Sequence, residues 1–201
     1  MKTFEAKKFN IPELKGISAK NIEEHLKLYE GYVKHANLIL QRIPDYKQWE
    51  EKDPFVTYFV SELQRRFSFE FNGMRNHEYY FSSFEGGSAT LSINGPLQKA
   101  IAEDLDGFDP WLAYFKTMAL TRGVGWAMLY FDPVSKRLVN AWIDEQHLGQ
   151  LSACIPVLAL DMWEHSFVYD YQPSGKKQYI EDFFANLNWD VIEKNFSQAI
   201  K

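Results

Sequence analysis

The stretch from Val157 to His165 holds the residues best suited to chemistry. It is an apolar, strand-like run that reaches the carboxylate of Asp161 and, four residues later, the imidazole of His165. A buried charge without a partner is costly, and a metal ion would satisfy both side chains. Taken alone, a capping carboxylate beside a hydrogen-bonded core histidine is the commoner explanation, so a metal site requires ligands from elsewhere in the chain.

Two further histidines, His25 and His77, lie in aromatic-rich segments that are expected to be helical. With Asp161 and His165 they would provide three imidazoles and one carboxylate, a set that suits a transition metal such as Mn, Fe or Zn and leaves room for a solvent ligand. Aromatic surroundings would exclude water and allow the protein to tune a redox potential.

The helix that carries His25 is expected to begin after Ser18, a good N-cap residue, and to run to about Arg42. Its apolar residues recur at steps of three and four and form one buried stripe, with His25 and Tyr32 beside it.

A second helix is expected to start at Asp53-Pro54, after the break at Pro44-Asp45, and to extend towards His77 and Phe81. Two long helices with a short connection form an antiparallel hairpin. Their facing sides could bring His25 and His77 together, although the sequence alone does not establish that contact.

The rest of the chain alternates between helical and extended patterns after a Gly-rich boundary at residues 85–96. Helices are expected at 97–105 and 109–121, strands at 126–131, 138–143 and 157–164, and a helical tail at 176–200 with a break at 186–188. The order predicts an α+β fold, in which a helical hairpin (1–88) precedes a domain with a three-stranded antiparallel sheet flanked by helices (89–201).

Composition excludes several classes of function. The net charge is −5, the pI is near 5.6, and the sequence contains no polycationic stretch. These properties argue against nucleic-acid binding and favour a small substrate. No apolar run approaches membrane-spanning length. A single cysteine, Cys154, and the absence of a secretory signal pattern lead us to expect a cytoplasmic protein without a disulfide.

Six short patterns occur along the chain in a recognisable order and spacing. They are Ile22-Glu23-Glu24-His25 followed by Tyr32-Val33; Asn76-His77; Gly123-Val124-Gly125-Trp126; Asp161-Met162-Trp163-Glu164-His165; Asp170-Tyr171; and Asn188-Trp189. Each is weak alone, but together they cover nearly the whole chain. In this order the chain resembles the iron/manganese superoxide dismutase family.

The resemblance implies that His25, His77, Asp161 and His165 bind one Mn or Fe ion per subunit, with water or hydroxide as a fifth ligand. The implied activity is conversion of superoxide to dioxygen and hydrogen peroxide. The resemblance also implies a homodimer or homotetramer in which Glu164 reaches the other subunit's His165. It further implies that Trp163 and Trp126 wall the site, although ordinary core packing is an equal alternative for Trp126.

Members of the family place a Gln or His against the bound solvent, either four residues before the second ligand or in the loop after the second strand. Here Gly73 takes the first place and Gln146 the second, with His147 as the alternative if the register differs by one. The amide of Gln146 could donate to bound hydroxide and shift its pKa and the metal potential. The combination resembles manganese-type members.

The chain departs from the common family pattern at the mouth of the site. The usual His four residues after the first ligand is Tyr29, and the usual Tyr eight residues after it is Val33, while Tyr32 stands at seven. The usual second Tyr after the last ligand is also missing, at Val168. We expect Tyr32 to supply the gate hydroxyl if the helix winds one residue tighter; otherwise it is a packing residue.

Two other functions compete with dismutation. A metal-dependent hydrolase or peroxide-active enzyme could use the same ligands, but no spare carboxylate is clearly placed as a general base. A family-like protein that keeps the fold and the metal for stability or assembly, with little activity, is the alternative that the altered mouth suggests.

Overall fold

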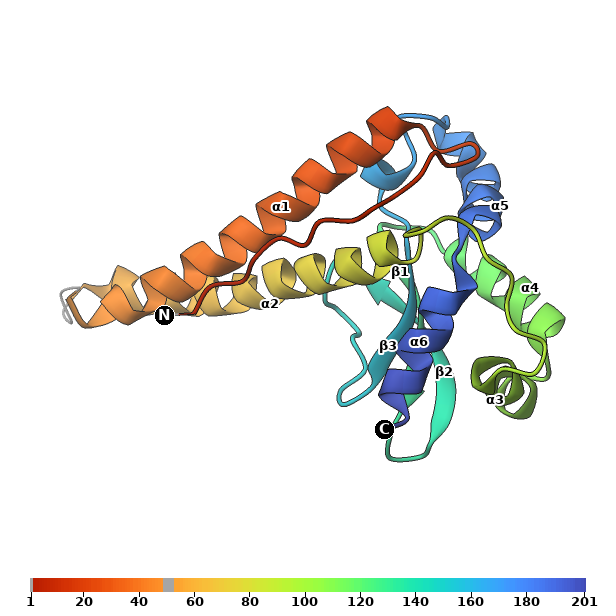
Figure 1. Cartoon of the computed structure of the whole chain (residues 1–201). Helices are drawn as coiled ribbons and strands as arrows, with labels where there is room; N and C mark the ends of the chain where they lie inside the picture. The colour runs from red at the N-terminus through yellow and green to blue at the C-terminus, as the bar shows by residue number, and fades with distance from the viewer. Residues whose placement is uncertain (1, 49–52) are drawn as a thin grey trace.

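The structure is a computed structural model that describes residues 2–48 and 53–201. Figure 1 shows two long helices that project as a hairpin from a domain built on a three-stranded sheet, with shorter helices around that sheet. The expected α+β fold class is therefore confirmed. The division of the chain at residues 88 and 89 stays a prediction.

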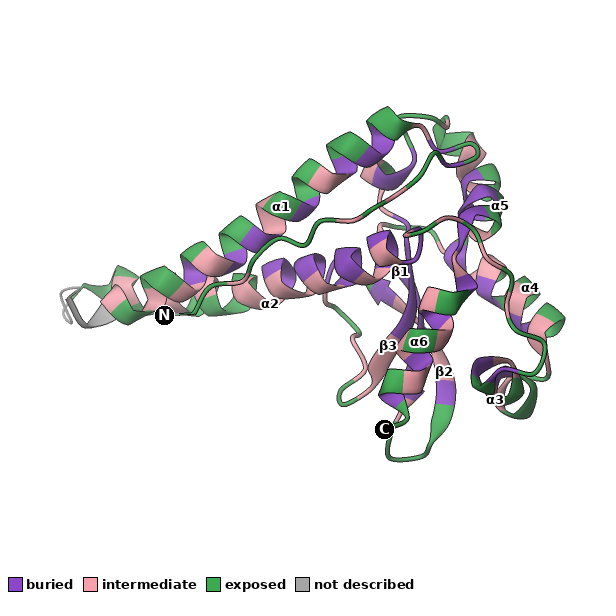
Figure 2. Ribbon diagram, viewed as in Figure 1, coloured by how far each residue is buried: buried purple, intermediate pink, exposed green. Residues whose placement is uncertain are grey.

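The hairpin consists of α1 (Ala19–Arg42) and α2 (Pro54–Ser82), with the short 3₁₀ helix η1 (Ile43–Gln48) after α1. Both long helices begin at side-chain caps: Ser18 accepts from the Asn21 amide at 3.1 Å, and Asp53 accepts from the Phe55 amide at 2.9 Å. In Figure 2 the buried residues of α2 lie in its second half, near the sheet, those of α1 form a stripe along the helix, and the far end of the hairpin is largely exposed. The part of the hairpin near the sheet is thus the part that can hold a water-excluding site.

The sheet contains β1 (Gly125–Asp132), β2 (Arg137–Asp144) and β3 (Ile155–Asp161), in the order β2-β1-β3 with both pairs antiparallel. The central strand β1 is buried along almost its whole length. Trp126 on β1 pairs with Ile143 on one side and Asp161 on the other. The start of β1 therefore lies beside the carboxylate at the end of β3.

Strand β3 ends earlier than expected. It stops at Asp161 instead of residue 164, because the Asp161 carboxylate accepts from the Trp163 amide at 2.8 Å and turns the chain into the 3₁₀ helix η2 (Glu164–Ser166). Apolar character continues into Met162 and Trp163, which is why the sequence suggested a longer strand.

The remaining helices are α3 (Pro96–Asp104), α4 (Phe108–Ala119), α5 (Lys176–Asn186) and α6 (Trp189–Ala199), with a second short 3₁₀ helix, η3 (Pro173–Gly175), before α5. Their ends differ from the expected ends by at most two residues. The expected break in the C-terminal tail lies at Leu187–Asn188, where Asn188 caps α6. Among the described residues, no helix has the length and apolar character that a membrane span requires.

Candidate metal centre

Four side chains from four separate elements meet where the hairpin joins the sheet. His25 comes from α1, His77 from α2, Asp161 from the end of β3 and His165 from η2. The Nε2 atoms of His25, His77 and His165 lie 3.1, 3.5 and 3.2 Å from Oδ2 of Asp161. One ligand atom from each residue falls within 4.8 Å of all the others. The two helix histidines are thus brought together, with ring centroids 4.9 Å apart.

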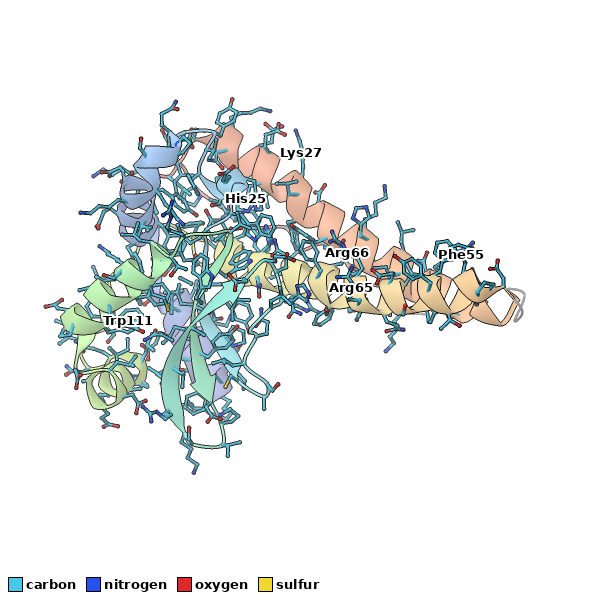
Figure 3. All side chains as sticks on the ribbon, turned by 180° about the vertical axis from the view of Figure 1, so that it is seen from behind. His25, Lys27, Phe55, Arg65, Arg66 and Trp111 are labelled. Carbon is cyan, nitrogen blue, oxygen red and sulfur yellow. The ribbon has the colours of Figure 1, made fainter. Side chains whose placement is uncertain are left out.

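Local geometry explains how these side chains reach one point. In Figure 3, His25 points from α1 towards the interior of the molecule, whereas Lys27 points outwards. On the other side, the tight turn after β3 is held by Ser166, which donates to the Asp161 carbonyl at 3.0 Å. Because the turn folds the chain back, the His165 ring reaches its own Asp161 carboxylate.

His77 is oriented by the backbone of its own helix. Its Nδ1 donates to the Gly73 carbonyl at 2.6 Å, so the proton sits on Nδ1 and Nε2 carries a lone pair. His77 is fully buried, and its Nε2 has no hydrogen-bond partner among the residues that the structure describes. A buried lone pair that faces the Asp161 carboxylate at 3.5 Å fits a bound cation, and three imidazoles with one carboxylate fit Mn or Fe.

Burial sets the protonation states that such an ion needs. Burial, together with repulsion from His25, lowers the pKa of His77 to about 3, and burial lowers the pKa of His25 as well. Burial alone would raise the pKa of Asp161, but attraction to His165 and hydrogen bonds from His165 and His25 outweigh it, so this pKa lies below its usual value. The buried imidazoles are neutral and the carboxylate ionised at neutral pH, as metal binding requires.

These pKa values predict that the metal-free protein loses stability on acidification. The folded-state pKa values of His25 and His77 lie below the ordinary value of 6.5, so the unfolded chain binds more protons. The free energy of unfolding should therefore fall, by on the order of a few kcal/mol, as the pH drops from about 6.5 towards 3. Urea unfolding of the metal-free protein at several pH values measures this. His77→Gln should flatten the dependence, because the imidazole with the lowered pKa is then absent.

A second layer of side chains lies against His77. The ring centroids of Tyr32 and Trp126 are 5.1 and 5.0 Å from the His77 ring. Between them lies the buried amide of Gln146, which accepts from Nε1 of Trp126 at 2.9 Å and donates to the Tyr32 hydroxyl oxygen at 3.0 Å. Because an indole N–H can only donate, the amide oxygen must face Trp126 and the NH₂ group must face Tyr32.

Tyr32 reaches the site without any irregularity in its helix. Residues 19–42 form one uninterrupted α-helix, and a spacing of seven residues returns to within about 20° of the same face. Burial, followed by the charges of Asp161 and Glu70, raises the pKa of Tyr32. Its hydroxyl is therefore neutral at pH 7 and, while accepting from Gln146, keeps its own proton to donate.

Tyr29, at the position of the usual gateway histidine, is fully buried, with its ring centroid 6.4 Å from that of His77. Its hydroxyl accepts from the Lys7 amide at 2.8 Å and lies 3.4 Å from Oε1 of Glu78. Glu78 is itself buried and paired with Lys7 and Arg75, each at 2.8 Å. Tyr29 thus connects the N-terminal segment to the hairpin, and Val168, at the other altered position, is exposed.

Gly73 leaves the space that the Tyr32 ring occupies. A Cβ atom at Gly73 would lie 2.6 Å from Cδ1 and 2.8 Å from Cε1 of Tyr32. A residue with a side chain here would displace Tyr32 from Gln146, which gives a physical reason for the glycine at this position of α2.

We therefore expect Gly73→Ala to destabilise the protein by about 1–3 kcal/mol through overpacking and to reduce activity, because Tyr32 must move. Gly31→Ala is the matched control in the same hairpin, since nothing lies within 4 Å of its added Cβ atom and alanine is the better helix former. That variant should be stabilised by about 0.5–1 kcal/mol. Thermal unfolding measures the stability of both variants, and turnover measures their activity. Equal changes in stability for the two variants would contradict the packing argument.

The other expected site residues lie close by. The Trp163 ring stacks on His165 with centroids 5.6 Å apart, and its Nε1 donates to the Glu145 carbonyl at 3.1 Å. His147 instead packs against Phe69, at 5.6 Å between centroids. Glu164 is exposed directly beside His165.

Two contacts near the site were not anticipated from the sequence. The Asn76 side chain donates to the Gln146 backbone carbonyl at 3.1 Å, and Gln150 donates to the Asn76 side chain at 3.2 Å. Asn76 was noted only for its place before His77, and Gln150 gave no signal, because a polar residue in a loop is ordinarily exposed.

Comparison with known proteins was consistent with this geometry. The family model described as "Iron/manganese superoxide dismutases, C-terminal domain" matches residues 93–195. The chain is 35% identical over 190 residues to the Superoxide dismutase [Fe] of Aquifex aeolicus, covering 94% of this chain and 88% of that protein. It is 33% identical to the Superoxide dismutase [Fe] of Cupriavidus metallidurans, with 94% and 93% covered. It is 29% identical to the Superoxide dismutase [Mn/Fe] of Aeropyrum pernix, with 88% and 80% covered.

The C-terminal match contains Asp161 and His165, and the full-length similarities extend over the hairpin that contributes His25 and His77. In the structure the same four residues form one cluster that could hold a metal ion, here called the ligand cluster. The chain therefore belongs to the iron/manganese superoxide dismutase family.

Proposed function

We propose that this protein is a superoxide dismutase that works with one Mn or Fe ion per subunit, held by His25, His77, Asp161 and His165. The observation that carries the proposal is the convergence of three imidazole nitrogens on one buried carboxylate oxygen, with ligand atoms within 4.8 Å of one another. The names of relatives that are similar over nearly the whole chain support it.

When bound, the ion would supply one-electron chemistry, in which one superoxide is oxidised to dioxygen and a second is reduced, with two protons, to hydrogen peroxide. The chain's own residues would do the rest. His77 is held in one tautomer by the Gly73 carbonyl, and the rings of Trp126 and Trp163 exclude water from two sides. Gln146 orients the Tyr32 hydroxyl, and that hydroxyl holds a proton close to the ligand cluster.

The contact between Tyr32 and Gln146 favours an active enzyme over a family-like protein that only keeps the fold. The usual gateway pair is absent, but a hydroxyl and an amide still meet beside His77, where proton delivery would be needed. A protein without turnover would have no use for a buried, paired polar group at this place, since burying it has a cost.

Reconstitution tests the proposal directly. The metal-free protein is loaded separately with Mn and with Fe, and superoxide consumption is measured per bound metal. Activity with either ion supports the proposal and identifies the working cofactor. Full occupancy with each ion but no turnover would contradict the proposal and favour the structural role. Hydrolytic activity with Zn alone would favour the metal-dependent hydrolase.

We also propose that the protein is a cytoplasmic homodimer or homotetramer, with Glu164 of one subunit bonded to His165 of the other. The exposed Glu164 next to the partly exposed His165 supports this, as does the free thiol of Cys154 for a reducing compartment. Sedimentation of the unaltered protein and of Glu164→Ala tests the assembly: the variant should shift towards monomer.

A further inference from the structure

We propose that Tyr130 and Gln150 are positioning residues, which hold the Gln146 amide in place through Asn76. The effect of these residues on turnover rests on the proposed function, but the positions of the bonds can be tested without it. The inference concerns a chain of hydrogen bonds that leads from the sheet, through the loop after β2, to helix α2.

The chain of hydrogen bonds starts inside the sheet. The buried Tyr130 hydroxyl donates in a short contact to Oε1 of Gln150. Nε2 of Gln150 lies 3.2 Å from Oδ1 of Asn76 and 3.4 Å from the backbone carbonyl of Gln146. Nδ2 of Asn76 donates to the same carbonyl at 3.1 Å. Two amides from distant parts of the chain therefore hold one backbone carbonyl, and its residue carries the side chain that contacts Tyr32.

The direction of every bond in this chain follows from one atom. The Gln146 carbonyl can only accept, so both amides must present NH₂ groups to it. The oxygen of Asn76 then faces Gln150, which donates to it, and the oxygen of Gln150 faces Tyr130, which must donate. The opposite orientation would place two acceptors against each other. The Gln146 carbonyl thus fixes the orientation of both amides, and Tyr130 supplies the donor that holds the oxygen of Gln150.

The loop that carries Gln146 needs these hydrogen bonds, here called the clamp, to keep its conformation. Glu145, which precedes Gln146, has a φ of +52°, and Ala153 has a φ of +64°. Each non-glycine residue in this left-handed region costs on the order of 1 kcal/mol, so the loop conformation is held by its contacts and not by local preference. The Asn76 and Gln150 bonds hold the Gln146 carbonyl itself, in addition to the backbone bonds of Glu145 to Val124 and of Asp144 to Leu148 on either side.

Strand β1 holds the loop at both ends. Trp126 and Tyr130 are four residues apart on the same face of β1, because side chains alternate along a strand. Trp126 bonds the side chain of Gln146, and Tyr130 bonds Gln150. The spacing of two residues on one rigid, buried strand therefore sets the position of the amide relative to His77.

The test uses Gln150→Leu and Tyr130→Phe in the full-length chain. The first removes the amide at similar volume; the second removes only the hydroxyl and is the milder variant if the first does not fold. The indole N–H signal of Trp126, assigned from its loss in Trp126→Phe, is recorded by NMR in the metal-free protein. It reports the bond to Gln146 independently of any activity. Turnover is measured on the same variants loaded with Mn or Fe.

Asn140→Leu is the matched control. Asn140 accepts from the indole N–H of Trp111 at 3.0 Å, so this variant also removes a tryptophan–amide bond, but at Trp111 on α4, which lies away from His25 (Figure 3). It should shift the Trp111 signal and leave the Trp126 signal and turnover unchanged.

We expect Gln150→Leu to shift the Trp126 signal and to lower kcat roughly tenfold at unchanged metal content, with a smaller effect for Tyr130→Phe. An unmoved Trp126 signal in both variants would overturn the positioning role, and a shifted signal with unaltered kcat would overturn its importance for turnover. If the unaltered protein loaded with either ion has no dismutase activity, the proposed function fails, while the Trp126 result still decides whether the clamp exists.

Discussion

Asp161→Asn is expected to abolish metal binding and to reduce superoxide turnover by more than roughly a hundredfold. The reason is the direction of the new amide. The Trp163 backbone amide donates to Oδ1 of Asp161, so the oxygen of an asparagine must remain at that position. The NH₂ group then replaces Oδ2, the atom on which three imidazole nitrogens converge. An isosteric change thus places a donor where the site needs a ligand.

Asp182→Asn is the control for this prediction. Asp182 is also a buried carboxylate, and it accepts from the Tyr171 hydroxyl at 2.8 Å and from the Gln178 amide at 3.1 Å, away from the ligand cluster. We expect this variant to lose stability but to retain the full metal content. Metal analysis of both purified variants, with unfolding curves, separates loss of a ligand from loss of fold. Normal metal content and turnover in Asp161→Asn would show that the ligand assignment is wrong.

Gln146→Ala is expected to keep its metal and lose turnover by roughly tenfold to a hundredfold. Without the amide, the Trp126 indole N–H and the Tyr32 hydroxyl each lose a buried partner, and the group that orients the Tyr32 proton is gone. The four ligand residues keep their own contacts, so binding of the ion should persist. Metal content and kcat measured on the same preparation test this combination.

His147→Ala is the comparison that separates the two neighbouring residues. His147 packs on Phe69 and makes no contact with Tyr32 or Trp126 comparable to that of Gln146. We therefore expect nearly unchanged turnover. If His147→Ala lost activity while Gln146→Ala retained it, our assignment of Gln146 would be wrong, and His147 would be the residue that acts beside the site.

The elements that carry the ligand cluster were predictable because local rules determine them. Ser18 and Asp53 cap the hairpin helices at the expected residues, and helical periodicity placed His25 next to the buried stripe of α1. The four candidate ligands came from side-chain chemistry together with the family resemblance, and the structure brings these side chains into one cluster. The end of β3 was not predictable from apolar character, because the turn depends on one side-chain bond from Asp161 to the Trp163 amide.

Contacts between distant parts of the chain were beyond the reach of sequence patterns. Whether Tyr32 faces the site depends on how tightly α1 winds, and only the structure shows a continuous helix. The need for a glycine at position 73 arises from the Tyr32 ring, which packs against it from the other helix of the hairpin. The contact between Gln150 and Asn76 joins a loop to a helix more than seventy residues earlier in the chain. Each depends on tertiary packing, which no local propensity encodes.

The distribution of the four ligand residues also affects the order of events during protein synthesis. His25 and Asp161 are separated by 136 residues in the sequence, yet their side chains meet in the fold. The hairpin emerges from the ribosome first, with two of the four residues, His25 and His77, and without Asp161 and His165. The site can form only after translation has passed residue 165. An ion that needs all four side chains would therefore bind only after the hairpin and the sheet have both been synthesised.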